Sequence, residues 1–159
     1  YQEAFNIRGG YYPGINAATL ALLCNRPEEA QKLAGQVRDI CRGHGLGDLL
    51  AAERCWVLAT EGEASLLLLQ SSAAASCYAN ALAILTEDQA GIAQSAYNQV
   101  CRLCWALGPA VVAPVVEVFR NCRFALKPGP LGDCNPGPEL LDPPPSHPDP
   151  GGEGAGASR

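Results

Sequence analysis

The sequence predicts an all-α fold, built from antiparallel helical hairpins and followed by a disordered C-terminal tail. Apolar residues recur at helical spacing, most regularly in one run: Ala30, Leu33, Ala34, Val37 and Cys41. Alanines stand where two helices must meet, and small residues let antiparallel helices approach closely. Residues 127–159 hold nine prolines and seven glycines, so they cannot bury enough surface to offset their ordering entropy. We therefore predict a helical-repeat domain over residues 1–126 and a tail over residues 127–159.

The first predicted hairpin begins after Pro13 and Gly14, which are expected to stop whatever precedes them. Asn16 then caps a short helix over residues 17–24. The second helix opens with a pattern like a capping box, formed by Asn25 and Glu28, and Pro27 lies in its first turn. The small residues expected at the contact between the two helices are Ala18, Ala21, Ala30 and Ala34.

The second predicted hairpin follows the glycines at 43, 45 and 47. Asp48 caps a third helix that runs to about Leu69, and Ser71 or Ser72 caps a fourth helix that reaches Leu85. Four residues of this hairpin stand at the spacing of a tetratricopeptide unit: Gly62, Ala74, Tyr78 and Ala81. An ordinary bundle of packed helices is the alternative, and the spacing leaves it open.

The last part of the predicted domain is less regular. Thr86 and Gln89 form a capping box that opens a fifth helix, which ends at Leu107 before Gly108 and Pro109. Residues 111–126 favour a sixth helix with Pro114 in its first turn, while their β-branched run leaves an edge strand as the alternative. At the other end, the pattern Tyr1, Ala4 and Phe5 is typical of the end of a repeat helix, so we expect a fragment of a longer array.

Composition limits the partners and the compartment. The net charge is −5 and there is no basic run, which argues against nucleic acid and against anionic membrane surfaces. There is no apolar span long enough to cross a membrane and no signal peptide. Most of the eight cysteines fall on helical apolar stripes, which predicts reduced core thiols and a cytoplasmic protein.

The candidate chemical sites are sparse, so we predict no enzyme, no cofactor and no metal. Cys101 and Cys104 have metal-ligand spacing, but zinc needs a second pair, and a redox pair remains the alternative. His44 and His147 lack a nucleophile with an orienting acid beside them. The proline-rich tail is predicted to be unstructured, with a polyproline ligand as the alternative.

The N-terminal region resembles a known family. The residues on which the resemblance rests are Tyr1, Ala4 and Phe5, followed by Gly14, Ile15, Asn16, Ala17, Ala18 and Leu20. They resemble the tetratricopeptide-containing TRAF-binding domain of the apoptosis-signal-regulating kinases and of bacterial proteins with the same domain, over about residues 1–107. The resemblance implies a helical scaffold that recruits partners without catalysis. The sequence contains neither the Gly-rich loop nor the His-Arg-Asp loop of a kinase.

These observations predict a protein–protein interaction or scaffold module whose partner is a protein or a peptide. The alternatives are a redox-responsive module that uses Cys101 and Cys104, and a non-catalytic fragment of a larger enzyme. In stacked hairpins the first helices line the concave side, here residues 17–24 and 48–69. The predicted groove residues are Glu53, Arg54, Trp56, Glu61 and Glu63. A buried Trp56 with solvated charges around it is the alternative for this stretch.

Overall fold

The computed structural model describes residues 1, 3 and 10–128, and within them it has six α-helices and no strand. The helices are α2 (Tyr11–Leu23), α3 (Pro27–Gly43), α4 (Ala51–Leu67), α5 (Ser71–Ile84), α6 (Ala90–Leu107) and α7 (Pro109–Arg120). The prediction of an all-α domain is therefore confirmed for this part of the chain. The predicted end of a helix at Ala4 and Phe5 and the predicted tail beyond Pro128 lie outside the described residues.

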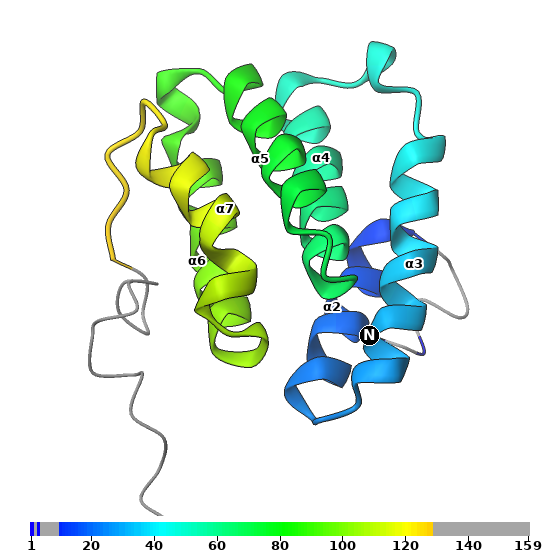
Figure 1. Ribbon diagram of the computed structural model, residues 1–159. Helices are drawn as coiled ribbons and strands as arrows, with labels where there is room; N and C mark the ends of the chain where they lie inside the picture. The colour runs from blue at the N-terminus through cyan, green and yellow to red at the C-terminus, as the bar shows by residue number, and fades with distance from the viewer. Residues whose placement is uncertain (2, 4–9, 129–159) are drawn as a thin grey trace, which may run out of the picture.

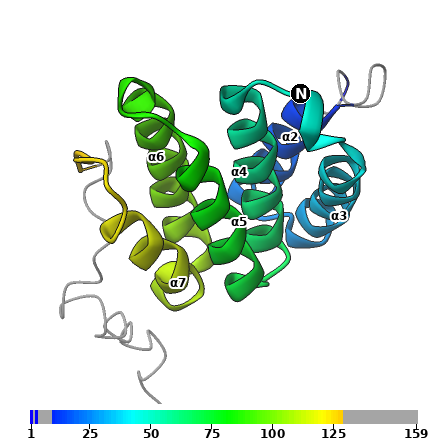
Figure 2. The same ribbon diagram turned by 90° about the horizontal axis from the view of Figure 1, so that it is seen from above.

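The helices pack in consecutive pairs, α2 with α3, α4 with α5 and α6 with α7 (Figure 1). Seen from above, α2, α4 and α6 lie on one side of the array and α3, α5 and α7 lie on the other (Figure 2). Helix α4 contacts both α2 and α6, and α2 and α6 also contact each other. The first helices of the three pairs therefore surround a common face.

Helix α2 begins earlier than predicted. It starts at Tyr11, so Pro13 and Gly14 lie inside its first turn, where the missing N–H of proline has no helical partner to lose. Asn16 therefore does not cap the helix, and its side-chain Nδ2 donates to the Tyr12 carbonyl at 2.8 Å. The prediction that Pro13 and Gly14 stop the preceding chain is wrong for this reason.

The same turn joins the helices of the first two pairs. Asn25 has a positive φ of 58° and ends α2, with the Arg26 N–H bonded to the Ala21 carbonyl. Leu69 has a φ of 60° and ends α4, with the Gln70 N–H bonded to the Ser65 carbonyl. Both are Schellman turns. Asparagine tolerates the left-handed conformation of such a turn better than leucine does.

Two predicted helix starts, at Asn25 and at Asp48, are wrong. Asn25 closes α2 and does not open α3, which begins at Pro27 with proline in its first turn. Asp48 lies in a short 3₁₀ turn, Leu46–Asp48, and α4 begins three residues later at Ala51. The Leu50 N–H at that start donates to Glu53 Oε2 at 3.1 Å, so a carboxylate inside the first turn satisfies it.

The third pair resolves the region that the sequence left open. The Thr86 N–H donates to Gln89 Oε1 at 3.1 Å, as the predicted capping box requires, and a 3₁₀ turn leads into α6. Gly108, with a φ of 84°, ends α6. Residues Pro109–Arg120 then form helix α7, so the strand alternative is wrong, and Pro109 takes the first-turn position that was expected for Pro114.

The contact between α4 and α5 is close because its residues are small. A Cβ at Gly62 would lie 2.9 Å from two ring atoms of Tyr78, which is closer than real Cβ contacts come. Ala74 and Ala81 are buried in the core cluster on α5. Behind this contact, the rings of Tyr78 and Phe119 lie 5.3 Å apart, so α7 packs on the far side of the same tyrosine.

The described cysteines are free, and three of them, Cys41, Cys55 and Cys101, are buried. Burial raises the pKa of the Cys41 thiol to about 12 and that of the Cys55 thiol to about 11, which keeps both thiols protonated at neutral pH. Cys24 directly follows the last residue of α2 and is exposed, so it is not a core residue. Within residues 10–128, the helices are too short or too polar for a membrane span.

Candidate functional site

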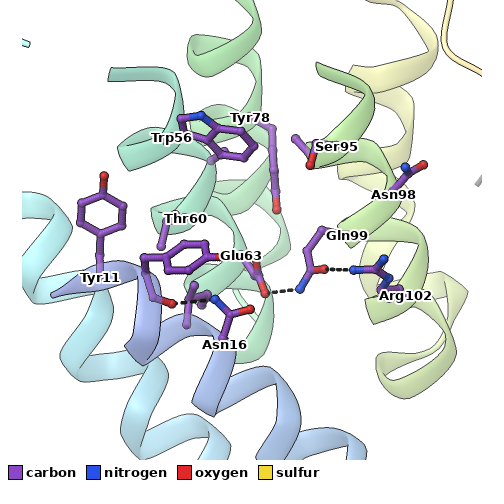
Figure 3. Close-up of a pocket in the computed structure, with 14 residues that line it drawn as sticks. Tyr11, Asn16, Trp56, Thr60, Glu63, Tyr78, Ser95, Asn98, Gln99 and Arg102 are labelled. Carbon is purple, nitrogen blue, oxygen red and sulfur yellow. Dashed lines mark hydrogen bonds between the residues drawn. The ribbon is translucent and has the colours of Figure 1, made fainter. Parts of the chain in front are cut away.

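A cavity of about 490 Å³ opens on the face that α2, α4 and α6 share (Figure 3). Each of these first helices contributes one stripe to its wall, and Tyr78 of α5 completes it from behind. The lining residues are Tyr11, Tyr12, Ile15 and Asn16 from α2, Trp56, Ala59, Thr60 and Glu63 from α4, and Ser95, Ala96, Asn98, Gln99 and Arg102 from α6. We call this cavity the groove.

The stripes follow from helical spacing. Trp56, Ala59, Thr60 and Glu63 lie at i, i+3, i+4 and i+7, and the same spacing joins Ser95, Asn98, Gln99 and Arg102. The opposite side of α6 carries the buried residues of the core, including Val100 and Leu103. The residues of α6 were not among the predicted groove residues, although the polar spacing of this helix is present in the sequence.

The floor of the groove is a hydrogen-bond network centred on Glu63. Thr19 Oγ1 donates to Glu63 Oε1 at 2.6 Å, and Gln99 Nε2 donates to the same oxygen at 2.8 Å. Arg102 Nη1 in turn donates to Gln99 Oε1 at 3.0 Å. The network thus joins α2, α4 and α6 through side chains that lie far apart in the sequence. Figure 3 shows the part of it that runs from Glu63 through Gln99 to Arg102.

The electrostatics of this floor are set by burial. Only 7% of the Glu63 residue is exposed, and loss of solvent raises the pKa of its carboxyl group. The hydrogen bonds from Thr19 and Gln99 and the charge of Arg102 act in the opposite direction, and burial dominates. The pKa of Tyr78 is also raised well above its ordinary value, by burial first and then by the negative charge of Glu63. A carboxyl group and a phenol therefore share one poorly solvated region.

The mouth of the groove is aromatic and exposed. Tyr12 is 64% exposed and Trp56 is 38% exposed, although both side chains have large apolar surfaces. Aromatic side chains of this kind supply most of the binding energy in protein interfaces when a partner covers them. The alternative of a Trp56 buried in the core is therefore wrong.

The five predicted groove residues separate into two groups. Trp56 and Glu63 line the cavity. The other three lie outside it, because their positions on α4 turn them toward other neighbours. Glu61 Oε1 accepts a hydrogen bond from Arg42 Nε of α3 at 2.7 Å, and Glu53 binds the Leu50 N–H. Arg54 is half-buried, and its Nε is without an acceptor among the described residues.

The predicted structural motif also touches the groove. Gly14 and Ile15 are buried in α2, whereas Asn16 is half-buried and lines the cavity beside Ile15. The predicted thiol pair lies elsewhere: Cys101 is 1% exposed in the core, and Cys104 is half-buried. Burial of Cys101 leaves little access for an oxidant at this pair.

The side chains of the groove offer amides, hydroxyls, aromatic rings, the guanidinium of Arg102 and one buried carboxylate. In the part of the chain that the structure describes, groups of three or more metal-ligating side chains do not occur. Amides and hydroxyls can donate to and accept from a peptide backbone, while the aromatic rings can cover apolar side chains. The arrangement suits recognition of an extended ligand along the three helices.

Comparisons with known proteins give no guide to the function, since no family model, no curated protein and no solved structure matches the chain.

Proposed function

We propose that this chain is a protein-interaction module that binds a peptide segment of a partner in the groove between α2, α4 and α6. The observation that carries the proposal is the groove itself, a cavity of about 490 Å³ with exposed aromatic rings at its mouth and polar side chains on its floor. A volume of this size is in the range of ligand sites, about 300–1,000 Å³. The first helices of stacked hairpins commonly line such a concave face.

The proposal includes a tetratricopeptide-like type for the hairpins. It is supported by the close approach of Gly62 to Tyr78 and by the buried Ala74 and Ala81, which hold the positions that the repeat spacing gives to small and aromatic residues. The shared turns at Asn25 and Leu69 support a repeated unit as well. Free thiols persist in a reducing compartment, which supports a cytoplasmic setting.

The test is to fill the groove without disturbing the core. Ser95 is exposed and lines the cavity, so Ser95→Phe places a large ring in the mouth. Ser76 is exposed on α5 and does not line it, so Ser76→Phe is the matched control. A displayed library of random short peptides is selected on the immobilised full chain, and the captured peptides are then measured against both variants.

We expect Ser95→Phe to weaken captured peptides by about tenfold or more, and Ser76→Phe to leave their affinity unchanged. Equal binding to the wild type and to Ser95→Phe would place the interaction elsewhere and contradict the proposal. Circular dichroism of both variants checks that the helices are intact.

A further inference from the structure

The groove contains a buried carboxylate whose hydrogen-bond donors are both neutral. Thr19 supplies a hydroxyl and Gln99 an amide, and both donate to the same oxygen, Oε1 of Glu63. Buried charges are normally paired with an opposite charge, because desolvation is not repaid by neutral donors alone. A carboxylate has acceptor sites on both oxygens, so Oε2 retains capacity for a further donor.

The second charged side chain of the groove is Arg102, and its geometry directs it to another partner. Its Nη1 binds Gln99 Oε1 at 3.0 Å, so the arginine orients the amide that in turn donates to Glu63. Arg102 is itself exposed, so solvent screens its charge. Its charge lowers the pKa of Glu63, but less than burial raises it, so the carboxylate is only partly compensated.

Aromatic rings stand on the same side of the groove as the carboxylate. Trp56 and Glu63 share one stripe of α4 with Thr60 between them, and Tyr78 extends its hydroxyl toward the Glu63 side (Figure 3). The faces of tryptophan and tyrosine attract a cation, and the attraction grows when solvent is excluded. The aliphatic stem of lysine or arginine can also lie against such rings.

We propose that the groove recognises a basic side chain of the partner peptide, a lysine ammonium or an arginine guanidinium, which pairs with Glu63 and lies against Trp56. The inference rests on the proposed function, since it names the chemistry of the peptide that the groove binds. The net charge of −5 favours encounter with a cationic segment. Arg102 repels a cation at its own end of the groove and so fixes the register of the peptide.

A purely structural role for Glu63 is the rival explanation. Its hydrogen bonds to Thr19 and Gln99 hold α2, α4 and α6 together, and a polar hub can serve only to fix the arrangement of helices. The two explanations differ in one respect. A structural hub tolerates loss of the negative charge if both hydrogen bonds remain, whereas a cation site does not.

The experiment uses random short peptides displayed as a library and selected on the immobilised full chain. We expect captured peptides to carry lysine or arginine at one position more often than the starting library. The basic residue of a synthesised consensus peptide is then replaced by glutamine, and both peptides are titrated by fluorescence anisotropy. The replacement should weaken binding by about tenfold or more, because it leaves a buried charge without its partner.

Two variants locate the effect on the protein. Glu63→Gln keeps an acceptor for both hydrogen bonds and removes the charge, so the basic and the glutamine peptides should bind it with nearly equal affinity. Glu61→Gln is the matched control, because Glu61 lies two residues away and pairs with Arg42 outside the groove. If Glu63→Gln fails to fold, Trp56→Ala takes its place, and it should reduce the preference for the basic peptide.

The outcomes separate the inference from the proposed function. Suppose that Ser95→Phe excludes the captured peptides, but that these peptides carry no basic residue or bind Glu63→Gln as tightly as the wild type. This result would overturn the inference and leave the interaction module intact. If no peptide depends on the groove, both are overturned. Preference for a basic residue that Glu63→Gln abolishes and Glu61→Gln preserves supports both.

Discussion

The two sides of helix α4 differ in how closely they pack against neighbouring helices. Toward α5 it leaves no space, since a Cβ at Gly62 would lie 2.9 Å from the ring of Tyr78. Toward α2 and α6 it leaves a cavity of about 490 Å³, with Glu63 on the floor and Trp56 at the mouth. The difference indicates that small residues set the close spacing of α4 and α5. On the other side of α4, the large side chains do not fill the cavity, so they are available to contact a ligand.

Three consecutive residues of α4 face three different sets of neighbouring helices. Glu61 binds Arg42 of α3, Gly62 lies under Tyr78 of α5, and Glu63 bonds to side chains of α2 and α6. Successive side chains on a helix point about 100° apart, so neighbours in sequence face different helices. Changes within this short run can therefore test the closed side and the open side separately.

The largest effect is expected on the closed side. Gly62→Ala places a methyl group against the buried ring of Tyr78, which cannot move without disturbing Phe119 behind it. We expect the free energy of unfolding to fall by about 1–3 kcal/mol in urea denaturation. Gly35→Ala is the control, because nothing lies within 4 Å of a Cβ there and the helix should gain about 0.5–1 kcal/mol. Equal stability of the two variants would show that α4 and α5 are not in close contact.

The closed side was largely predictable from the sequence, whereas of the five predicted groove residues only Trp56 and Glu63 line the open side. Gly62, Ala74, Tyr78 and Ala81 belong to one hairpin, so their spacing alone predicts that they meet. The floor of the groove joins residues 44 and 36 positions apart, from three different pairs of helices. No local pattern distinguishes Glu63 from Glu61, and only the rotation of α4 within the array separates them.

The errors at helix ends have a related cause. Asn25 is a good residue both for opening a helix and for closing one in the left-handed conformation, and the chain uses it to close α2. Pro13 is tolerated in a first turn and breaks a helix only further in, so its effect depends on where the helix starts. The sequence at Asn25 is compatible with opening or closing a helix, and the sequence at Pro13 with a first turn or a break. Packing of α2 against α3 selects one of the two at each position.

A smaller effect is expected when one donor to the groove floor is removed. Thr19→Val preserves the shape of the side chain and its β-branching, but Glu63 loses the hydroxyl bond at 2.6 Å. Hydrogen bonds to charged groups contribute about 1.5–3 kcal/mol, and we expect a loss at the low end of this range because Glu63 keeps its bond from Gln99. Calorimetric melting should show a lower midpoint for Thr19→Val than for Ser76→Ala, whose hydroxyl bonds to the Ser72 carbonyl at the surface.

The double variant sharpens this test. With Glu63→Gln in place, the acceptor is neutral, so removing the Thr19 hydroxyl should cost less than it does in the wild type. The same cost in both backgrounds would mean that the strength of this hydrogen bond does not depend on the charge of Glu63.

The smallest effect is expected from Glu63→Gln alone, and its sign depends on pH. Burial raises the pKa of Glu63 in the folded protein above the ordinary value of 4.5, so the folded state holds the proton more tightly than the unfolded state. The contribution of this group to stability is therefore fully present below pH 4.5 and is lost as the pH rises through the folded pKa.

Glutamine carries no proton to lose, and its carbonyl can still accept from Thr19 and Gln99. The melting temperature of Glu63→Gln relative to wild type should thus rise as the pH is raised from 4.5 to neutral, with the other carboxyl groups cancelling in the difference. A difference that stays constant, or that falls over this range, would mean that Arg102 compensates the carboxylate fully and that the floor of the groove is as well solvated as its mouth.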